Sequence, residues 1–277
     1  MAAIDERRVS RASLRTPYVL SVILAVCMAV QSSLGLAFPH LYRDTGYVKE
    51  TWFGNDLATL VLAVPLLAVG LVMERRGSPR GRLLWFGSLG YGVYNYAFYS
   101  LGAALNAFFL LYIVAFQLAL AAIVLGISRT DASEFARWFS TRTRARLIGG
   151  YLVFVAVGLA MVWGVMWAGY VWAGRPTPGG PEIFRLVAAL DLMFMVPALS
   201  LGGVLLWRRG SWGYLISVIA SVQAALYLAV LSLNGILFLA RGQAEPPGEL
   251  PVWGTLLVAT TIAAVLLLSH VGRKAPG

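Results

Sequence analysis

The stretches VPLLAVGLVMERRGS at 64–78 and VPALSLGGVLLWRRGS at 196–211 decide how the fold is interpreted, because they are two versions of one pattern. Each begins with Val-Pro, continues as an apolar run containing glycine, and ends in Arg-Arg-Gly-Ser. An apolar run of this kind is typical of the inner half of a membrane-spanning helix, and the arginines mark its aqueous boundary. We therefore interpret the chain as a membrane protein in which one helix with its turn occurs twice.

The composition of the chain supports this interpretation. Of its 277 residues, 59% are hydrophobic and 12% are charged, whereas soluble domains average about 25% charged residues. The net charge of +10 does not predict a nucleic-acid partner, because basic residues in a polytopic protein usually flank its helices. The single cysteine, Cys27, excludes an internal disulfide and a thiolate metal cluster. No metal site is predicted, and the sequence does not identify a cofactor.

Apolar segments predict an all-α protein with eight transmembrane helices. They lie near 17–38, 55–73, 82–103, 106–127, 147–172, 184–207, 212–240 and 252–271. The first segment follows a basic stretch, but it is longer than the core of a signal peptide and no cleavage site follows, so we expect a retained span. No loop is long enough for a soluble domain, so residues 1–277 are expected to form a single polytopic membrane domain.

The distribution of basic residues predicts that both termini lie in the cytoplasm. With that orientation, the inside segments carry 17 of the 22 Lys and Arg residues and the outside segments carry 5. This excess follows the positive-inside rule, and one missing or extra span would scramble it. Arginine outnumbers lysine 20 to 2, which favours a GC-rich bacterial genome and hence the bacterial cytoplasmic membrane.

The two opening stretches predict a tandem repeat of four and four helices, with halves at 17–127 and 147–271. Four spans separate the stretches, so both helices run in the same direction, and each contains a proline that is expected to kink it, Pro65 and Pro197. Parallel repeats are related by an axis along the membrane normal, and transporter sites often lie at the repeat interface. The alternative is that basic, glycine-containing turns recur by chance.

Polar residues in the outer halves of the spans predict a pocket open to the outside. Asp191 is flanked by apolar residues within its span, so its carboxyl group must face protein or water. Asp56 lies near the outer mouth of the second span, where it could instead cap the helix. The candidate ligand-binding residues are Asp191, Asp56, Asn95, Tyr91, Tyr99, Asn106, Asn234 and Gln31. The alternative for each amide and tyrosine is a hydrogen bond that joins neighbouring helices.

The stretch GYGVYNYAFYS at 90–100 suggests partners for Asp191. Tyr91, Asn95 and Tyr99 are spaced at i, i+4 and i+8 and share one helix face. We expect Asp191 to point into the bundle toward the second or third span, with these three residues as its partners. The aromatic residues of the fifth span are expected to form an interfacial belt instead; they are Trp163, Trp167, Tyr170 and Trp172.

The longest cytoplasmic loop, RTDASEFARWFSTRTRAR at 129–146, predicts a short amphipathic helix. Phe135, Trp138 and Phe139 fall on one face, and several arginines supply positive charge. This pattern is typical of a helix that lies on anionic lipid of the inner leaflet. The alternative is a basic loop whose aromatic residues pack on the bundle.

Three classes of function are compatible with these features. A transporter or channel-like protein for a small solute or ion would use the outer pocket and the kinked helices. A sensor, accessory or scaffold protein would use the pocket without transport, and its sign would be a sealed cytoplasmic side. An enzyme is less favoured, because no nucleophile stands beside the two aspartates and His40 and His270 lie near opposite faces.

The orientation is tested by labelling single cysteines in intact cells with an impermeant thiol reagent. Pro178→Cys should react, because position 178 lies in an outside loop, whereas Pro79→Cys should not. The parent chain with Cys27 alone is the control, and the reverse labelling pattern would contradict the orientation.

Overall fold

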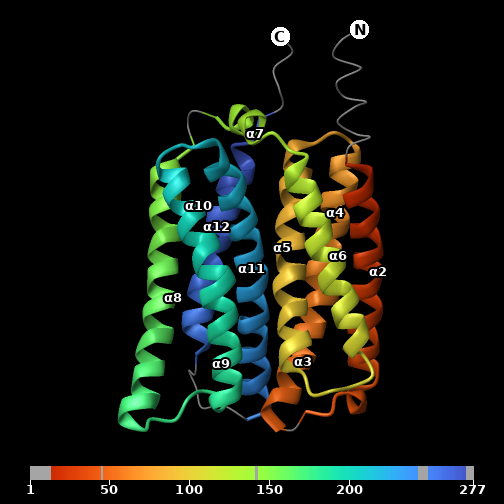
Figure 1. Ribbon diagram of the computed structural model, residues 1–277, viewed down its shortest axis with the longest axis vertical. Helices are drawn as coiled ribbons and strands as arrows, with labels where there is room; N and C mark the ends of the chain where they lie inside the picture. Colours follow the sequence, from red (N-terminus) through yellow and green to blue (C-terminus); the bar gives the residue numbers. More distant parts are fainter. Residues whose placement is uncertain (1–13, 45, 141–142, 243–248, 273–277) are drawn as a thin grey trace.

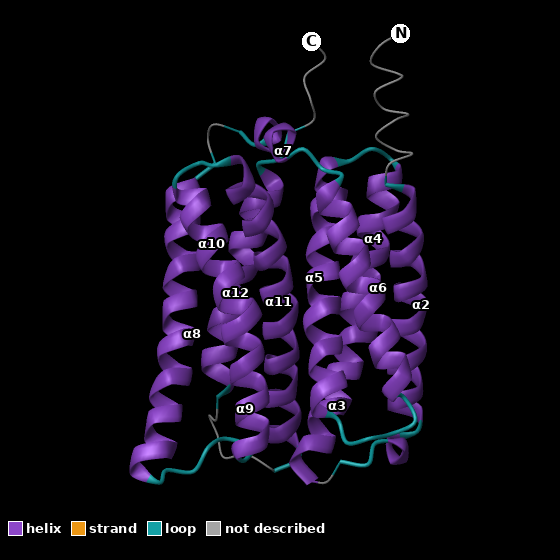
Figure 2. Ribbon diagram, in the orientation of Figure 1, coloured by secondary structure: helices purple, strands orange, loops and turns teal. Residues whose placement is uncertain are grey.

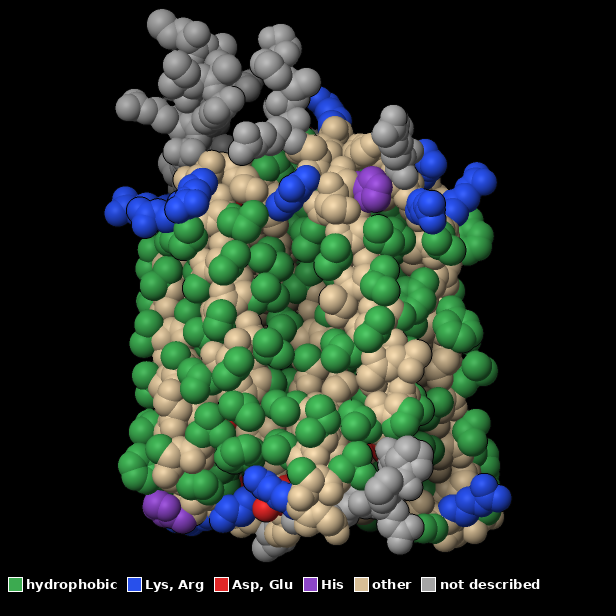
Figure 3. Space-filling model, turned by 180° about the vertical axis from the view of Figure 1, so that it is seen from behind, with side chains coloured by type: hydrophobic (Ala, Val, Ile, Leu, Met, Phe, Trp, Pro, Cys, Tyr) green, Lys and Arg blue, Asp and Glu red, His purple; other side chains and the backbone are tan. Residues whose placement is uncertain are grey.

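The computed structural model describes residues 14–44, 46–140, 143–242 and 249–272, which form a bundle of long helices without a β-strand (Figures 1 and 2). The elements are α2 (Arg15–Ala37), η1 (Pro39–Leu41), α3 (Gly46–Ala58), η2 (Thr59–Ala63), α4 (Val64–Arg75), α5 (Pro79–Gly102), α6 (Phe109–Ser128), α7 (Ala132–Trp138), α8 (Ala145–Ala173), α9 (Pro181–Leu190), η3 (Asp191–Met195), α10 (Val196–Trp207), α11 (Ser211–Ala240) and α12 (Leu250–Ser269). Basic side chains lie toward the two ends, and apolar side chains fill the band between them (Figure 3). This is the architecture of a multi-pass membrane protein.

Seven segments are long and apolar enough to cross a membrane, and they correspond to seven of the eight expected spans. The remaining one, expected at 82–103, is α5, a 24-residue helix packed against α4, α6 and α11. Most of its residues are buried, so its tyrosines and glycines contact protein where the other helices expose apolar side chains. The second span begins earlier than expected, because α3 starts at Gly46. The alternative that Asp56 caps this helix is therefore wrong.

Each of the two proline-containing helices has a wide turn just before its proline. A π-helical turn, η2, joins α3 to α4, and η3 joins α9 to α10. In both turns the N–H of the valine before the proline donates to a carbonyl five residues back, from Val64 to Thr59 and from Val196 to Asp191. A proline ring clashes with the carbonyl four residues before it in a regular helix, and the wider turn gives the ring room.

The helices form two groups that meet along α5 and α11 (Figure 1). In the first group α5 packs on α4 and α6, and α2 packs on α6; in the second, α10 packs on α8 and α11, and α11 packs on α12. Across the boundary α5 packs on α11, α3 packs on α11, and α9 packs on α5. We call the end of the bundle that holds Arg15 and Ser269 the terminal end, and the end that holds Gly102 and Pro181 the far end (Figure 1).

Glycine contacts within the two groups recur at one spacing. A Cβ at Gly70 of α4 would press on the backbone of Trp85 in α5, and a Cβ at Gly202 of α10 would press on the backbone of Ser217 in α11. Both residues of the second pair lie 132 positions after those of the first (202 minus 70 and 217 minus 85). The π-helical turns η2 and η3 begin 132 positions apart as well (191 minus 59).

The turns after α4 and α10 each contain a left-handed residue, and these residues are also 132 positions apart. Gly77 has φ 75° and Arg209 has φ 57°. The two Arg-Arg-Gly-Ser motifs are 133 positions apart, so the second motif places arginine where the first has glycine. A left-handed conformation costs a residue with a Cβ roughly 1 kcal/mol more than glycine.

The short helix α7 lies across the terminal end of the bundle and packs on α11 (Figure 1). Phe135 is fully buried, and the ring of Phe139 lies 4.6 Å from that of Tyr214 in α11. Arg82 of α5 stands over the rings of Phe135 and Trp138. The aromatic face therefore contacts protein, as in the alternative of packing on the bundle, and the binding of anionic lipid by 129–146 stays a prediction.

The left-handed turn generates a test by substitution. Arg209→Gly should raise the free energy of unfolding by about 1 kcal/mol, because glycine adopts positive φ without a Cβ penalty. Gly77→Arg should lower it by about the same amount at the matching position. Thermal unfolding of the purified protein in detergent measures both, and a lower midpoint for Arg209→Gly would show that the arginine side chain has a stabilising role here.

Candidate functional site

A buried carboxylate cluster lies at the far end of the first group, around Asp56 of α3. Its Oδ1 accepts from Gln31 Nε2 in α2 at 2.9 Å and from the Tyr99 hydroxyl of α5 at 2.8 Å. Its Oδ2 accepts from the Tyr42 hydroxyl at 2.6 Å. Tyr96 of α5 donates to Gln31 Oε1 at 3.1 Å, which orients that amide so that its NH2 group faces the carboxylate. Three donors from three segments thus hold Asp56.

Aromatic rings enclose this carboxylate. Trp52 stacks on Tyr99 at 4.7 Å and on Tyr42 at 6.2 Å, and Tyr112 of α6 stacks on Tyr99 at 4.9 Å. Burial, reinforced by the charge of Asp56, raises the pKa of Tyr42, so this tyrosine acts as a neutral donor. The Asp56 cluster is therefore sealed, and it joins α2, α3 and α5 rather than opening to the outside.

A second cluster surrounds Asp191 at the start of η3. Tyr94 of α5 donates to Oδ1 at 2.6 Å, and Trp163 of α8 donates its indole N–H to Oδ2 at 3.0 Å. The ring of Tyr94 packs 4.7 Å from that of Tyr227 in α11. Asp191 therefore points into the bundle toward the third span, as expected, but its partner there is Tyr94 and not Tyr91, Asn95 or Tyr99.

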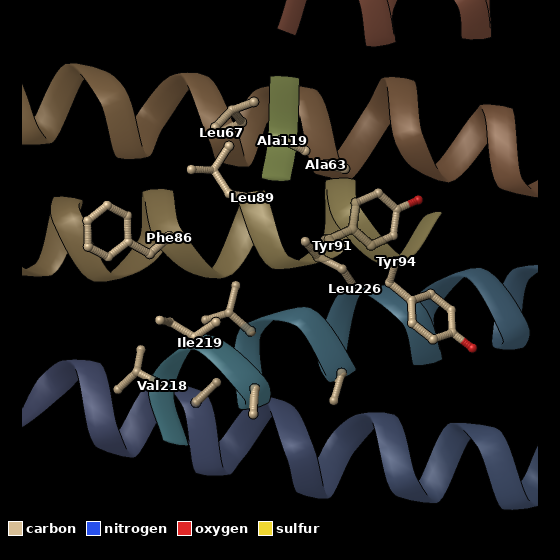
Figure 4. Close-up of a cluster of buried hydrophobic side chains, with 14 of the residues drawn as sticks. Ala63, Leu67, Phe86, Leu89, Tyr91, Tyr94, Ala119, Val218, Ile219 and Leu226 are labelled. Atoms are coloured by element: carbon tan, nitrogen blue, oxygen red, sulfur yellow. The ribbon is translucent and has the colours of Figure 1, made fainter. Parts of the chain in front are cut away.

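The expected stripe on α5 faces the second span instead. The hydroxyls of Tyr91 and Thr59 are 2.8 Å apart, and Asn95 Nδ2 donates to Thr59 Oγ1 at 3.5 Å. Tyr99 continues the same face to Asp56. Tyr91 and Tyr94 point in different directions from α5, Tyr94 toward α11 (Figure 4). Their positions differ by about 60° around the helix, and the two side chains reach different partners, Thr59 and Asp191.

A small cavity lies between the two groups at the far end, bounded by α3, α5, α9 and α11. Its volume is about 130 Å³. Its polar lining residues are Thr51, Asn55, Tyr94, Asn95, Tyr227 and Asn234. Apolar side chains from α3, α5, α9 and α11 complete the wall. Six polar residues therefore line one space, and the hydroxyls of two of them are already bonded, Tyr94 to Asp191 and Thr51 to the Val48 carbonyl.

Two of these asparagines are buried without an internal partner. Asn55 and Asn234 have relative exposures of 3% and 7%, and neither side chain makes a hydrogen bond within the described part of the chain. Asn234 Oδ1 lies against Gly54, where any Cβ would overlap it. Buried amides normally find partners in protein or ordered water. The Asn55 amide and Nδ2 of Asn234 therefore have hydrogen-bonding capacity left for a molecule in the cavity, whereas Asn234 Oδ1 is enclosed against Gly54.

The structure divides the candidate residues among five places. Asn95 and Asn234 line the cavity, Asp56 with Gln31 and Tyr99 forms the sealed cluster, and Tyr91 joins α5 to η2. Asn106 accepts from the backbone N–H of Phe108 and lies outside the cavity. Asp191 touches the cavity only through Tyr94, so the expectation of one pocket with both aspartates as its charges does not match this arrangement.

Several residues of these sites were not anticipated from the sequence. Trp163 was assigned to an interfacial belt, yet its N–H binds Asp191. Asn55 and Tyr94 stood next to chosen residues, and one position along a helix changes direction by about 100°. For Trp163 the sequence held one signal: it lies 132 positions after Gln31 (163 minus 31), and both side chains donate to an aspartate of the following helical segment.

The described residues contain no group of three or more His, Cys, Asp or Glu side chains that could hold a metal ion. No family model, curated protein or solved structure matches this chain. Inference about function therefore depends on the chemistry of the cavity and of the two carboxylate clusters.

The two carboxylate clusters generate a test of stability. Asp56→Ala leaves three buried donors without an acceptor and should cost about 3 kcal/mol, whereas Asp191→Ala leaves two and should cost about 2 kcal/mol. Asp56→Asn should recover most of the loss, because Tyr42 can rotate to accept from the new amide. The readout is thermal unfolding in detergent, with the exposed Glu182→Ala as control. Parent-like stability of Asp56→Ala would show that the network contributes little.

Proposed function

We propose that the protein is a transporter or channel-like protein for a small, uncharged polar solute, which it binds in the cavity between its two groups of helices. The observation that carries this proposal is a pair of buried residues, Asn55 and Asn234, that line the cavity and whose side chains make no hydrogen bond to another described residue. Such groups are costly unless water or a ligand satisfies them. A solute with both donors and acceptors would satisfy them.

The chemistry of the lining sets the class of solute. Amides and hydroxyls donate and accept, and neither Asp56 nor Asp191 lines the cavity. The lining therefore favours a neutral polar molecule over a cation. A volume of about 130 Å³ equals that of about four water molecules at roughly 30 Å³ each. A polyol or amide of about four to six heavy atoms matches this space.

The proposal includes eight spans with both termini in the cytoplasm. The helix α5, third in chain order, brings the number of spans from seven to eight, since it has 24 residues and lies within the bundle beside α4, α6 and α11. The positive-inside excess of 17 to 5 then places the terminal end in the cytoplasm and the cavity on the outside. The arginine-rich composition supports a bacterial cytoplasmic membrane, and the arginines of 129–146 would face anionic lipid at its inner surface.

The proposal also includes a four-plus-four repeat with an axis along the membrane normal. Contacts across the boundary between the groups support it. A Cβ at Gly87 would contact the side chain of Val222, and a Cβ at Gly90 would contact the side chain of Ile219. Each residue is 132 positions from a residue of the other pair (219 minus 87 and 222 minus 90), as in a self-complementary interface. Closer to the far end, Gly54 lies against the side chain of Asn234, and Gly102 lies against the side chain of Leu186. Each residue of one pair is again 132 positions from a residue of the other pair (186 minus 54 and 234 minus 102).

This axis passes between α5 and α11, so the cavity lies where alternating access would operate. In transporters with repeats, one half moves against the other around a central site. Here the two halves are in contact between the cavity and the terminal end, through Gly87 and Gly90. The helix α7 covers the terminal end itself. Release to the cytoplasm requires α5 and α11 to separate there, with displacement of Phe135 and Phe139.

The closed terminal end favours a second candidate function, a binding or sensor protein without transport. In that case the solute would enter and leave on one side, and α7 would keep its position. Binding alone would raise the stability of the protein in the presence of solute, because a ligand stabilises the state that binds it. The two candidates therefore differ in flux and agree in binding.

The proposal is tested by solute entry into proteoliposomes that contain the full chain, followed by light scattering after an osmotic step with glycerol, urea or acetamide. At least one of these solutes should enter faster than into empty liposomes. Asn234→Leu should remove most of that increase, because it replaces an amide of the cavity wall, whereas Thr255→Val on the exposed face of α12 should leave it unchanged.

The same solutes distinguish the second candidate through thermal unfolding. Solute stabilisation without flux supports a binding or sensor protein. Absence of both flux and stabilisation with all three solutes would contradict the assignment to small neutral molecules.

A further inference from the structure

An apolar crevice runs along the outside of the second group, between the far halves of α8 and α9. Its volume is about 480 Å³. Its walls come from Trp163, Gly164, Trp167, Phe184, Ala188 and Leu192 among others, with Arg185 as its basic residue. No buried residue of α8 lies beyond Ala156, so the far half of this helix leaves the crevice open along its length. In the first group, by contrast, α2 has buried residues as far as Gly35.

The dimensions of the crevice match one leaflet of a bilayer. It extends along α9 and η3 from Pro181 to Leu192, a rise of roughly 16 Å at 1.5 Å per residue. Half of a hydrocarbon core about 30 Å thick is about 15 Å. A single acyl chain that enters at the far end would therefore occupy the full length of the crevice.

The charge at the mouth of the crevice suits an anionic headgroup. Arg185 lines the crevice one turn into α9, and Arg175 lies over Gly169 in the adjoining loop. Neither arginine makes an ion pair with another described residue, and they outnumber the nearby Glu182. A guanidinium group binds phosphate through paired hydrogen bonds, and a long arginine side chain reaches the membrane surface from within a helix.

We propose that this crevice is a binding site for an anionic phospholipid, with one acyl chain along Trp163 and Trp167 and the phosphate on Arg185. The ring of Trp163 forms part of the wall, while its N–H donates to Asp191 inside the bundle. An acyl chain in the crevice holds that ring in place and so favours the present position of Asp191 and its second partner, Tyr94. The site is separate from the polar cavity, which lies on the other side of α9.

Two glycines of α8 provide a matched pair of variants. A side chain at Gly164 would fill the crevice without a clash, because nothing lies within 4 Å of a Cβ at that position. The same open space surrounds Gly158, which does not line the crevice. The two positions point about 120° apart around the helix. Gly164→Phe is therefore the blocking variant, and Gly158→Phe is the control for added bulk.

The test is photocrosslinking of the full chain in nanodiscs that contain a phosphatidylglycerol probe with a diazirine in its acyl chain. Mass spectrometry locates the adducts. We expect adducts within 160–171 and 181–192, reduced at least fivefold by Gly164→Phe and changed less than twofold by Gly158→Phe. Arg185→Gln should lower the phosphatidylglycerol adduct to the level given by a phosphatidylcholine probe.

Two results would overturn the proposal. Equal labelling of the parent chain by the two probes would indicate general contact with bilayer lipid only. An unchanged adduct yield in Gly164→Phe would show that the probe does not enter the crevice. Thermal unfolding of each variant confirms that it is folded, and neither result depends on whether the protein transports a solute.

Discussion

The close contact between α5 and α11 is the constraint on which the rest of the structure depends. Gly87 and Gly90 let Val222 and Ile219 approach the backbone of α5, and small residues allow helices in a membrane to pack closely. Because α5 is then surrounded by other helices, its tyrosines and Asn95 must find partners inside the protein. They do so on α3, η2 and η3. The polar networks at the far end therefore follow from the apolar contact between α5 and α11, which lies closer to the terminal end.

The same constraint separates three environments at the far end. Asp56 is enclosed by aromatic rings, and Asp191 lies between Tyr94 and Trp163. The cavity between them is lined by Asn55 and Asn234, whose side chains make no hydrogen bond to another described residue. The carboxylates hold helices together and fix tyrosines, while the amides face the space that a solute would occupy. This division explains why a neutral lining and two buried acids occur within one molecule.

The sequence predicted the helices well and the side-chain partners poorly. Apolar segment length identifies a span directly, so seven expected spans match, and α5 differs because an interior helix needs less apolar surface. The two Val-Pro motifs mark the places where the π-helical turns end. The turns themselves were not predicted, since their hydrogen bonds depend on backbone packing. Direction around a helix changes by about 100° per residue, so Asn95 was named as a partner of Asp191 whereas its neighbour Tyr94, which binds Asp191, was missed. Trp163, the other partner of Asp191, was missed as well.

The most direct test of the central claim is the reaction of a cavity cysteine with an impermeant thiol reagent. In a Cys27→Ser background, Asn234→Cys should react with reagent added outside intact cells, and a solute that binds should slow the reaction. Ser217→Cys, fully buried on α11 toward the terminal end, should remain unreactive. Reaction at position 234 with solute protection is the predicted result. No reaction at position 234 from outside in a folded protein would contradict the account, because the cavity between the two groups would then be closed to the solution that it is proposed to sample.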